Sequence, residues 1–295
     1  MHLNAATSII QHGQSLFVSC KKKGIYVMEG NELKQSLSLS VDIYKFIQKG
    51  AYLYGVGEAG TIVRLDLRNQ LWTKTTFPSP QRLWDIDGSD DGILVSHNGS
   101  KLVVSYNYGS SWDYISPFKK FKHPPIIRSL SLVGEWIYIG TQMHEESGVW
   151  RYHLLSKRME KITSLPYRMI SSIFHQDGVL YFTTGGFEEN LGSVEVVDLL
   201  TNQRKTILPP IKERALLDCF HVGSSLYLTS AQDQQGYSRI YLLEPNQMVP
   251  IEFVKGHSFR GTGNKDSLYI AGLREIKKSL LLPQLYYIKY RSDLL

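Results

Sequence analysis

A repeated pair of short alternating strands is the feature that most constrains the fold of this chain. Residues 224–244, SSLYLTSAQDQQGYSRIYLLE, read as an alternating strand, a polar turn that contains glycine, and a second alternating strand. A two-residue period interrupted by such a turn predicts an antiparallel hairpin and not a helix. The pair recurs along the chain, and the first strand of each pair contains one landmark residue: Phe17, Tyr54, Val95, Tyr138, Tyr181, Tyr227 and Tyr269.

Neighbouring landmarks are 37 to 46 residues apart. A period of about 40–50 residues with four short strands is typical of a propeller blade. We therefore predict an all-β fold, a single seven-bladed β-propeller built from four-stranded antiparallel blades. The expected blades are residues 5–40, 41–80, 81–122, 123–165, 166–210, 211–254, and 255–295 plus 1–4. Six blades are the alternative, because Val95 replaces the aromatic landmark in the third repeat.

The two chain ends predict how the ring closes. After the expected strand at 284–290 only residues 291–295 remain, which are too few for a full fourth strand. We expect residues 1–4 to pair as the outer strand of the last blade, which would remove an open sheet edge. The alternative is a short fourth strand at 292–295.

Composition is ordinary for a globular protein. Charged residues make up 20% and hydrophobic residues 42%, and the net charge of +6 is spread over 33 cations and 27 anions. Cys20 and Cys219 have no metal-binding spacing and make no disulfide framework. No secretory signal is visible, so we expect a cytoplasmic protein. No run of 18 apolar residues occurs, so we expect no membrane contact. We also expect a monomer.

One turn carries a recognisable motif. Residues 105–112, SYNYGSSW, resemble the Asp-box of sialidase-type and related BNR-repeat propellers, S-x-D-x-G-x-[ST]-W, with Asn107 in place of the aspartate. In that family the box fastens the turn between the third and fourth strands of a blade, so the resemblance implies a fold and not sialidase activity. Two further turns, at residues 66–70 and 198–203, resemble those of kelch repeats.

Cations recur in the segments that lead into the landmark strands. They are Arg82, Arg128, Arg168, Arg214, Arg260 and Lys45. In a propeller these segments line the central channel and one face, so the cations are expected to surround one mouth of the channel. Converging guanidinium groups suit a carboxylate or phosphate, because the planar fork binds two oxygens at once. Aromatic walls are expected from Trp84, Tyr44, Tyr167 and Phe259. The alternative is that each arginine forms an inter-blade salt bridge with Asp42, Asp85, Asp218 or Glu213.

Other motifs indicate turns or solvated loops. Residues 85–92, DIDGSDDG, lack the closing glutamate of a calcium loop and fall where a hairpin turn is needed. The nine histidines show no zinc-binding spacing. The basic run at 119–122, KKFK, is interpreted as a solvated loop in preference to a nucleic-acid contact. We therefore expect no metal, no cofactor and no nucleic-acid partner.

Two functional classes remain. The first is a non-catalytic binding or scaffold module that holds a peptide, a protein or an anionic small molecule at the arginine-rich mouth. The second is an enzyme with its site at the same mouth, either a sialidase-like glycoside hydrolase or a lyase or cyclase. The resemblance implies that sialidase chemistry would need three clustered arginines, a Tyr/Glu nucleophile pair and an Asp acid. Tyr44, Tyr167 and Asp85 are available, but no spacing selects them, and the sequence leaves catalysis open.

Overall fold

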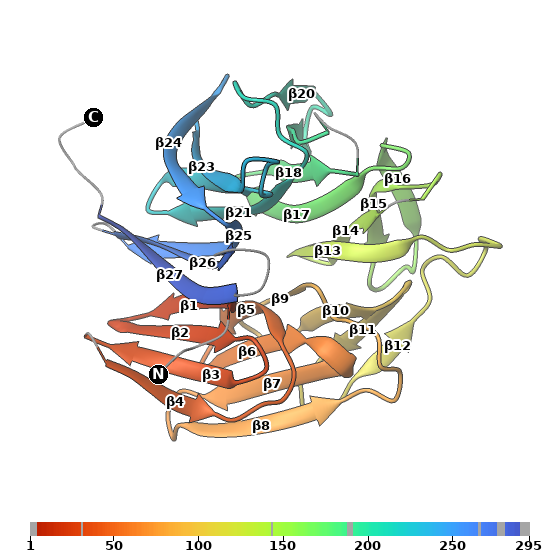
Figure 1. Ribbon diagram of the computed structural model, residues 1–295. Coiled ribbons are helices and arrows are strands. Elements are labelled where there is room, and N and C mark those ends of the chain that lie inside the picture. Colours follow the sequence, from red (N-terminus) through yellow and green to blue (C-terminus); the bar gives the residue numbers. More distant parts are fainter. Residues whose placement is uncertain are drawn as a thin grey trace.

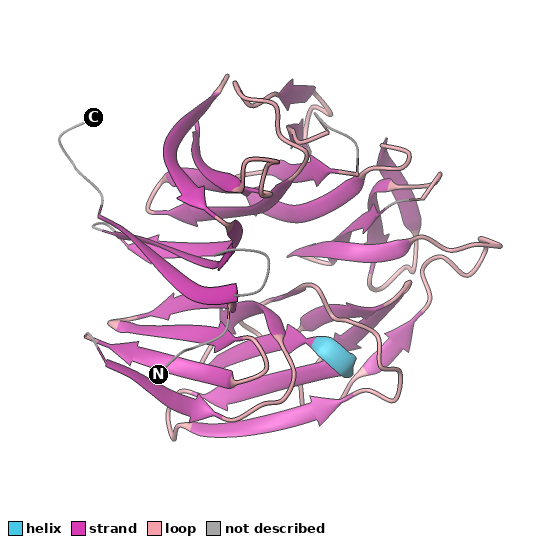
Figure 2. Ribbon diagram, viewed as in Figure 1, coloured by secondary structure: helices cyan, strands magenta, loops and turns pink. Residues whose placement is uncertain are grey.

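The structure, a computed structural model, describes residues 5–30, 32–142, 144–187, 191–264, 267–275 and 281–289. These residues form antiparallel sheets arranged in a ring, with the first strand of each sheet at the centre (Figure 1). The fold is a β-propeller. Helical structure in the described residues is limited to the single turn η1 (Glu58–Gly60), as Figure 2 shows. None of the described residues belongs to a helix with the length and hydropathy of a membrane span.

Within each four-stranded unit the strands follow one another from the centre of the ring to its rim. The first two sheets contain β1 (Ala6–His12), β2 (Ser15–Cys20), β3 (Gly24–Glu29) and β4 (Glu32–Leu37), then β5 (Ile43–Lys49), β6 (Tyr52–Gly57), β7 (Thr61–Asp66) and β8 (Leu71–Thr76). The next contains β9 (Ile86–Gly88), β10 (Leu94–Asn98), β11 (Lys101–Ser105) and β12 (Asp113–Ile115). An eight-stranded sheet contains β13 (Ile126–Val133), β14 (Trp136–Gln142), β15 (Gly148–His153), β16 (Met159–Ser164), β17 (Met169–Gln176), β18 (Val179–Gly185), β19 (Val194–Asp198) and β20 (Arg204–Ile207). The last two contain β21 (Leu216–Val222), β22 (Ser225–Ser230), β23 (Tyr237–Leu243) and β24 (Met248–Lys255), then β25 (His257–Asn264), β26 (Ser267–Glu275) and β27 (Leu281–Lys289).

Burial follows the position of a strand in its sheet. In β6 every residue after Tyr52 is buried, whereas five of the six residues of the outer strand β8 are exposed. Apolar side chains on the inner strands pack between neighbouring sheets: Phe17 of the first sheet and Phe46 and Leu53 of the second belong to one buried cluster. The alternating pattern therefore forms strands that bury both faces near the centre and become polar at the rim, as the sequence predicts.

Hydrogen bonding groups the strands of the described residues into six sheets, so the structure does not by itself confirm the predicted count of seven blades. The eight-stranded sheet consists of two four-stranded meanders, β13–β16 and β17–β20, which join where Gln142 of β14 pairs with Met169 of β17. No other pair of strands connects the two meanders among the described residues.

The first and last sheets lie against each other. The Gln11 N–H donates a hydrogen bond to Thr262 Oγ1 at 3.3 Å, and Ala271 belongs to the same buried cluster as Ile9 and Val18. Contact between β1 and β25 closes the ring. The strand predicted for residues 1–4, and its alternative at 292–295, lie outside the described residues.

The segment between β11 and β12 is fixed by its own side chains. Ser105 Oγ accepts the Gly109 N–H at 2.9 Å, and Asn107 Oδ1 accepts the Ser111 N–H at 2.9 Å. The Trp112 ring packs edge-on against Phe77 of the neighbouring sheet, 5.9 Å between centroids. These contacts make the segment a rigid turn that also links two sheets.

Two outer turns share one hydrogen-bond pattern. Asp66 Oδ1 accepts the Arg68 N–H at 3.0 Å, and Asp198 Oδ1 accepts the Leu200 N–H at 2.9 Å. Each turn then has a left-handed residue four positions after its aspartate: Gln70 at φ 60° and Asn202 at φ 57°. An aspartate that caps such a turn explains why the two sequences look alike.

Candidate functional site

A β-bulge at one position of the innermost strands builds the candidate site. The pairing register shifts by one residue in six of these strands, at Thr7, Tyr44, Arg128, Ser171, Leu217 and Phe259. Trp84 lies two residues before β9, at the corresponding place in its sheet. A bulge leaves one residue unpaired and turns its side chain out of the regular alternation.

Most of these side chains meet in one cavity of about 420 Å³, here called the inner pocket. Its walls include Thr7, Tyr44, Trp84, Arg128, Leu217 and Phe259. Lys21, Arg82 and Arg260 add positive charge to the lining, and Asp42 and Glu58 add negative charge. Six of the ten residues proposed from the sequence therefore line a single cavity.

Arg260 lies at the base of this pocket and connects four sheets. Its Nη1 donates to Asp218 Oδ1 at 2.8 Å, its Nε to the Tyr44 carbonyl oxygen at 3.0 Å, and its Nη2 to the Trp84 carbonyl oxygen at 3.2 Å. The side chains of Arg260 and Asp218 are 7% and 2% exposed. Each guanidinium nitrogen of Arg260 thus donates to a protein acceptor, and the salt-bridge alternative raised from the sequence is confirmed for this arginine.

Arg128 has a different environment. Its guanidinium lies 4.0 Å from the centroid of the Trp84 ring, and its buried Nη1 has no hydrogen-bond partner. It forms no ion pair with any residue that the structure describes. Burial, and then the positive charge of Arg260, lowers the pKa of Arg128 to about 9, so that the side chain remains a cation at neutral pH. A buried donor without an acceptor costs free energy unless a ligand supplies one.

Trp84 organises the aromatic part of the pocket. Its ring stacks on Tyr44 with 4.6 Å between centroids, and Arg82 lies 5.4 Å from its centroid. Arg82 is 58% exposed along its side chain and stands 4.0 Å from Glu58. Two arginines on one indole ring form a cation–π arrangement that leaves N–H donors free for an anion.

Glu58 lines the same pocket and lies beside Tyr44 and Arg82. It accepts a hydrogen bond from Tyr44 Oη at 3.1 Å and forms an ion pair with Lys22. Partial burial acts to raise the pKa of Glu58, but the hydrogen bonds from Lys22 and Tyr44 outweigh it and lower the pKa. The pKa of Tyr44 is raised by burial and then by the charge of Glu58. The pair is therefore a carboxylate and a neutral phenol at neutral pH.

His97 holds Trp84 from behind the pocket. Its Nε2 accepts a hydrogen bond from the backbone N–H of Trp84 at 3.0 Å, and its Nδ1 is buried without a partner. Burial, with a smaller contribution from Arg128, lowers the pKa of His97 to about 3. The ring is neutral at physiological pH, which is the state that can accept this hydrogen bond.

The remaining predicted residues lie outside the inner pocket. Lys45 stands 3.7 Å from Asp218, and Arg214 and Tyr167 are exposed; Tyr167 has a left-handed φ of 59°. The register of the bulge explains this placement. Arg128 is itself the bulged residue, whereas Arg168 and Arg214 each come three residues before theirs, so the five arginines do not occupy equivalent positions.

Aspartates from the inner strands serve another purpose. Asp85 Oδ2 accepts the Leu130 N–H at 3.0 Å, and Asp87 Oδ2 accepts the Leu132 N–H at 2.8 Å, both across a sheet boundary. Burial raises the pKa of Asp85, although Lys45 and Arg260 oppose this shift. These carboxylates of the calcium-like segment therefore join adjacent sheets. No cluster of three or more metal-ligating side chains occurs in the part of the chain that the structure describes.

Comparison with known proteins places this fold among propellers. No family model matches the chain. Its fold is similar to a chain of the mitotic checkpoint complex (TM-score 0.70, 10% identity, covering 98% of this chain and 91% of that one) and to U3-55K (TM-score 0.68, 12% identity, 96% and 97%). It is also similar to the RRP9 WD40 repeats (TM-score 0.65, 11% identity, 97% and 96%). Likeness at these identities shows the fold alone.

One curated relative is much nearer in sequence. The uncharacterized protein YkuO of Bacillus subtilis (strain 168) is 33% identical over 269 residues, which cover 88% of this chain and 90% of YkuO. Identity at this level over nearly the whole of both chains shows common descent, and the chain belongs to the same family as YkuO.

Proposed function

We propose that this protein is a binding module whose inner pocket holds a carboxylate or phosphate group of a peptide, a protein or a small molecule. The observation that carries the proposal is the buried Nη1 of Arg128, which faces no acceptor although the side chain remains charged. An anion between Arg128 and Arg82 would satisfy that donor and neutralise a desolvated charge. The Trp84 ring would form one wall beside it.

We also propose where the inner pocket lies relative to the blades and the central channel. We take the two meanders of the eight-stranded sheet as separate blades, which makes seven blades in total. The inner pocket then lies at one mouth of the central channel, below which Arg260 crosses between the inner strands. The turn at residues 105–112 would act as an Asp-box fastener at the rim, far from the ligand.

A sialidase-like activity is the second candidate, and one observation favours it. Tyr44 and Glu58 form a hydrogen-bonded pair in a cavity that also contains Arg82, Arg128 and Arg260. The electrostatics oppose this activity, because a tyrosine nucleophile needs a lowered pKa and a basic partner. Here the pKa of Tyr44 is raised and that of Glu58 is lowered, and Arg260 is paired with Asp218. Binding without catalysis is the better account of the same groups.

Replacing Arg82 with alanine and Arg128 with methionine is expected to abolish anion binding. Hydrogen bonds to charged groups contribute about 1.5–3 kcal/mol each, so the double variant should bind at least about 100-fold more weakly. Methionine preserves the packing of the stem. Relief of an unpaired buried charge offsets the lost cation–π contact with Trp84, so the melting temperature should change little. Ligand-induced thermal shifts across a panel of organic acids, sugar phosphates, sialyllactose and acidic peptides, followed by calorimetric titration of the hits, measure the effect.

The matched control replaces Arg168 and Arg214 with alanine, because these arginines lie outside the pocket. That variant should bind as the unaltered protein does. Equal loss in both double variants would contradict the pocket, and a fall in melting temperature in the Arg82/Arg128 variant alone would give those arginines a structural role. If the protein released the fluorophore from a fluorogenic sialoside and the Tyr44→Phe variant did not, a sialidase-like activity would replace the proposal of binding without catalysis.

A further inference from the structure

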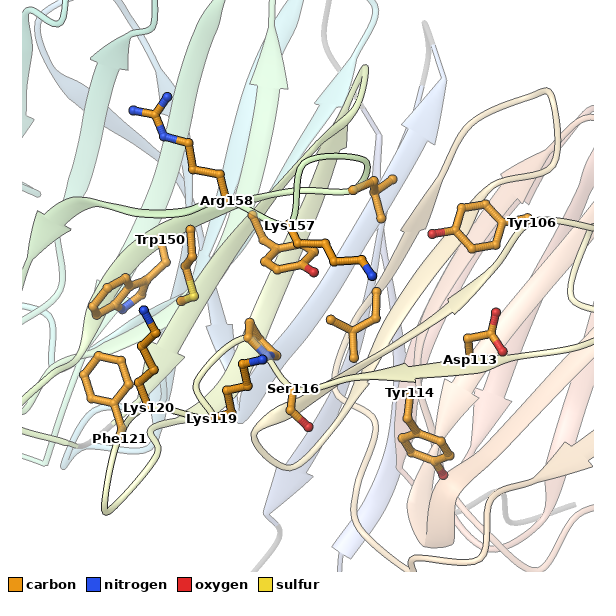
Figure 3. Close-up of a pocket in the computed structure, with 15 residues that line it drawn as sticks. Tyr106, Asp113, Tyr114, Ser116, Lys119, Lys120, Phe121, Trp150, Lys157 and Arg158 are labelled. Carbon is orange, nitrogen blue, oxygen red and sulfur yellow. The ribbon is translucent and has the colours of Figure 1, made fainter.

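A second cavity lies on the circumference, between the outer strand β12 and the strands β15 and β16. It is a groove of about 770 Å³, and Figure 3 shows its lining. The segment from Asp113 to Pro117 forms one side, and the turn that carries Lys157 and Arg158 forms the other. We name it the rim groove. The basic run that the sequence suggested was a solvated loop contributes Lys119, Lys120 and Phe121 to it.

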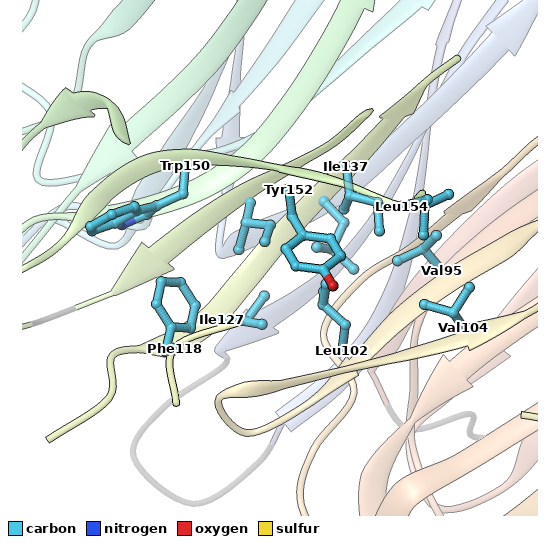
Figure 4. Close-up of a cluster of buried hydrophobic side chains, with 11 residues drawn as sticks. Val95, Leu102, Val104, Phe118, Ile127, Ile137, Trp150, Tyr152 and Leu154 are labelled. Atoms are coloured by element: carbon cyan, nitrogen blue, oxygen red, sulfur yellow. The ribbon is translucent and has the colours of Figure 1, made fainter. Parts of the chain in front are cut away.

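The floor of the rim groove is apolar and fixed. Trp150, Tyr152 and Leu154 belong to a buried cluster that continues beneath the groove (Figure 4). Phe118 and Phe121 meet the Trp150 ring edge-on, each with 5.6 Å between centroids. Side chains packed in this way are already in place before any partner arrives, which lowers the entropic cost of binding.

The walls of the groove are basic. Lys119, Lys120, Lys157 and Arg158 line it, and Asp113 is the one carboxylate among its described lining residues. Arg158 forms an ion pair with Glu160, whereas none of the three lysines has a salt bridge to a described residue. Figure 3 shows aromatic side chains at the two ends of the groove, Trp150 and Phe121 at one and Tyr106 and Tyr114 at the other. Lys119 and Lys157 lie between these ends, and Lys120 lies beside Trp150 and Phe121.

One polar group in the floor lacks a partner. Trp150 is 8% exposed, and its Nε1 is buried with no hydrogen-bond acceptor. An indole N–H in the floor of a groove is a donor suited to a carbonyl oxygen of an extended chain. A ligand carbonyl oxygen that reached this N–H would satisfy it.

We propose that the rim groove binds an acidic peptide segment of a partner protein, with an apolar side chain on the floor and carboxylates on the lysines. Charge complementarity selects an acidic partner. Single-stranded nucleic acid is less suitable because it needs free aromatic faces. Here Lys161 lies 4.8 Å above the Trp150 ring, and Phe77 and Lys101 flank Tyr114.

Fluorescence anisotropy tests this proposal with three labelled probes. They are the peptide Glu-Glu-Leu-Trp-Glu-Glu, the same peptide with glutamine at each glutamate, and a ten-nucleotide oligothymidylate. The acidic peptide should bind saturably, more tightly than the other two, and more weakly as salt is added. Replacing Lys119, Lys120 and Lys157 with glutamate should weaken the affinity for the acidic peptide by about tenfold or more. These side chains are exposed, so the variant should keep its melting temperature.

The control reverses three exposed lysines elsewhere, Lys23, Lys74 and Lys212, and should leave binding unchanged. The Arg82→Ala/Arg128→Met variant should also retain it, so the rim groove and the inner pocket can fail independently. No saturable binding of the acidic peptide, or equal loss in the control triple variant, would overturn the proposal. Tighter binding of the oligothymidylate would replace it with a nucleic-acid site.

Discussion

Replacing Asp218 with alanine is expected to destabilise the protein by about 3–5 kcal/mol, because it leaves a buried cation without its counter-ion. Asp218 Oδ1 lies 2.8 Å from Arg260 Nη1 and 3.7 Å from Lys45 Nζ, and its Oδ2 accepts the Gly261 N–H at 3.1 Å. The same arginine bonds to carbonyl oxygens of two other sheets, so the loss should spread across the ring. Urea unfolding measures the free energy, and the melting temperature should fall by about 6 °C or more.

Two variants separate this ion pair from a general effect of losing a carboxylate. Glu32→Ala removes an exposed partner of Lys34, at 3.3 Å, and should change stability little. The double variant Asp218→Leu/Arg260→Met removes both buried charges together and should recover much of the loss. An Asp218→Ala protein as stable as Glu32→Ala would contradict the central role given to Arg260.

Mild acid is expected to destabilise the protein through His97. The folded pKa is lowered from 6.5 to about 3, so the unfolded chain takes up a proton first. The stabilising contribution is therefore complete above pH 6.5 and is lost as the pH falls toward 3. The slope is about 1.4 kcal/mol per pH unit, which gives a loss of about 2 kcal/mol at pH 5. Urea unfolding at pH 7 and pH 5 measures it.

His97→Gln provides the control, since the amide oxygen can still accept the Trp84 N–H but does not titrate. Other groups titrate in both proteins. The raised pKa of Asp85, for example, acts in the opposite sense and favours the folded state in acid. The difference between the two proteins isolates the imidazole. A pH dependence that is identical in both would show that His97 is not held neutral by burial.

The strands were predictable because the physics that forms them is local. The strand–turn–strand pattern predicted at residues 224–244 is β22 (Ser225–Ser230) and β23 (Tyr237–Leu243), which pair as an antiparallel hairpin. Alternation of apolar and polar residues and turn-forming residues are properties of neighbouring positions. The number of sheets does not follow from this local pattern, because it depends on how Gln142 and Met169 pair across one boundary.

The site was predictable only in part, because it depends on register. Sequence spacing brought Arg82, Arg128 and Arg260 into one group, but the directions of Arg128 and Arg260 depend on where their strands bulge. Arg260 follows its bulged residue and turns to Asp218, whereas Arg128 is the bulged residue. A shift of one position thus separates a structural arginine from one without an acceptor.

Glu58 was missed for a different reason. It lies in η1, beyond the strand that pairs with the strand of Tyr44, and no spacing marks it. Its partner Lys22 belongs to a basic run that looks like solvated surface in the sequence. Contacts between separate sheets of this kind depend on how the blades pack, and a single chain without its coordinates does not contain a local signal for them.

The most direct test of the account is an anomalous-difference map from crystals soaked in selenate, a tetrahedral dianion that scatters strongly. We expect a peak in the inner pocket within hydrogen-bond distance, about 3 Å, of the Arg128 guanidinium and beside Trp84. The peak should be absent in crystals of the Arg82→Ala/Arg128→Met variant. An empty inner pocket, with selenate bound instead at arginines outside it such as Arg168 or Arg214, would contradict anion binding by this pocket.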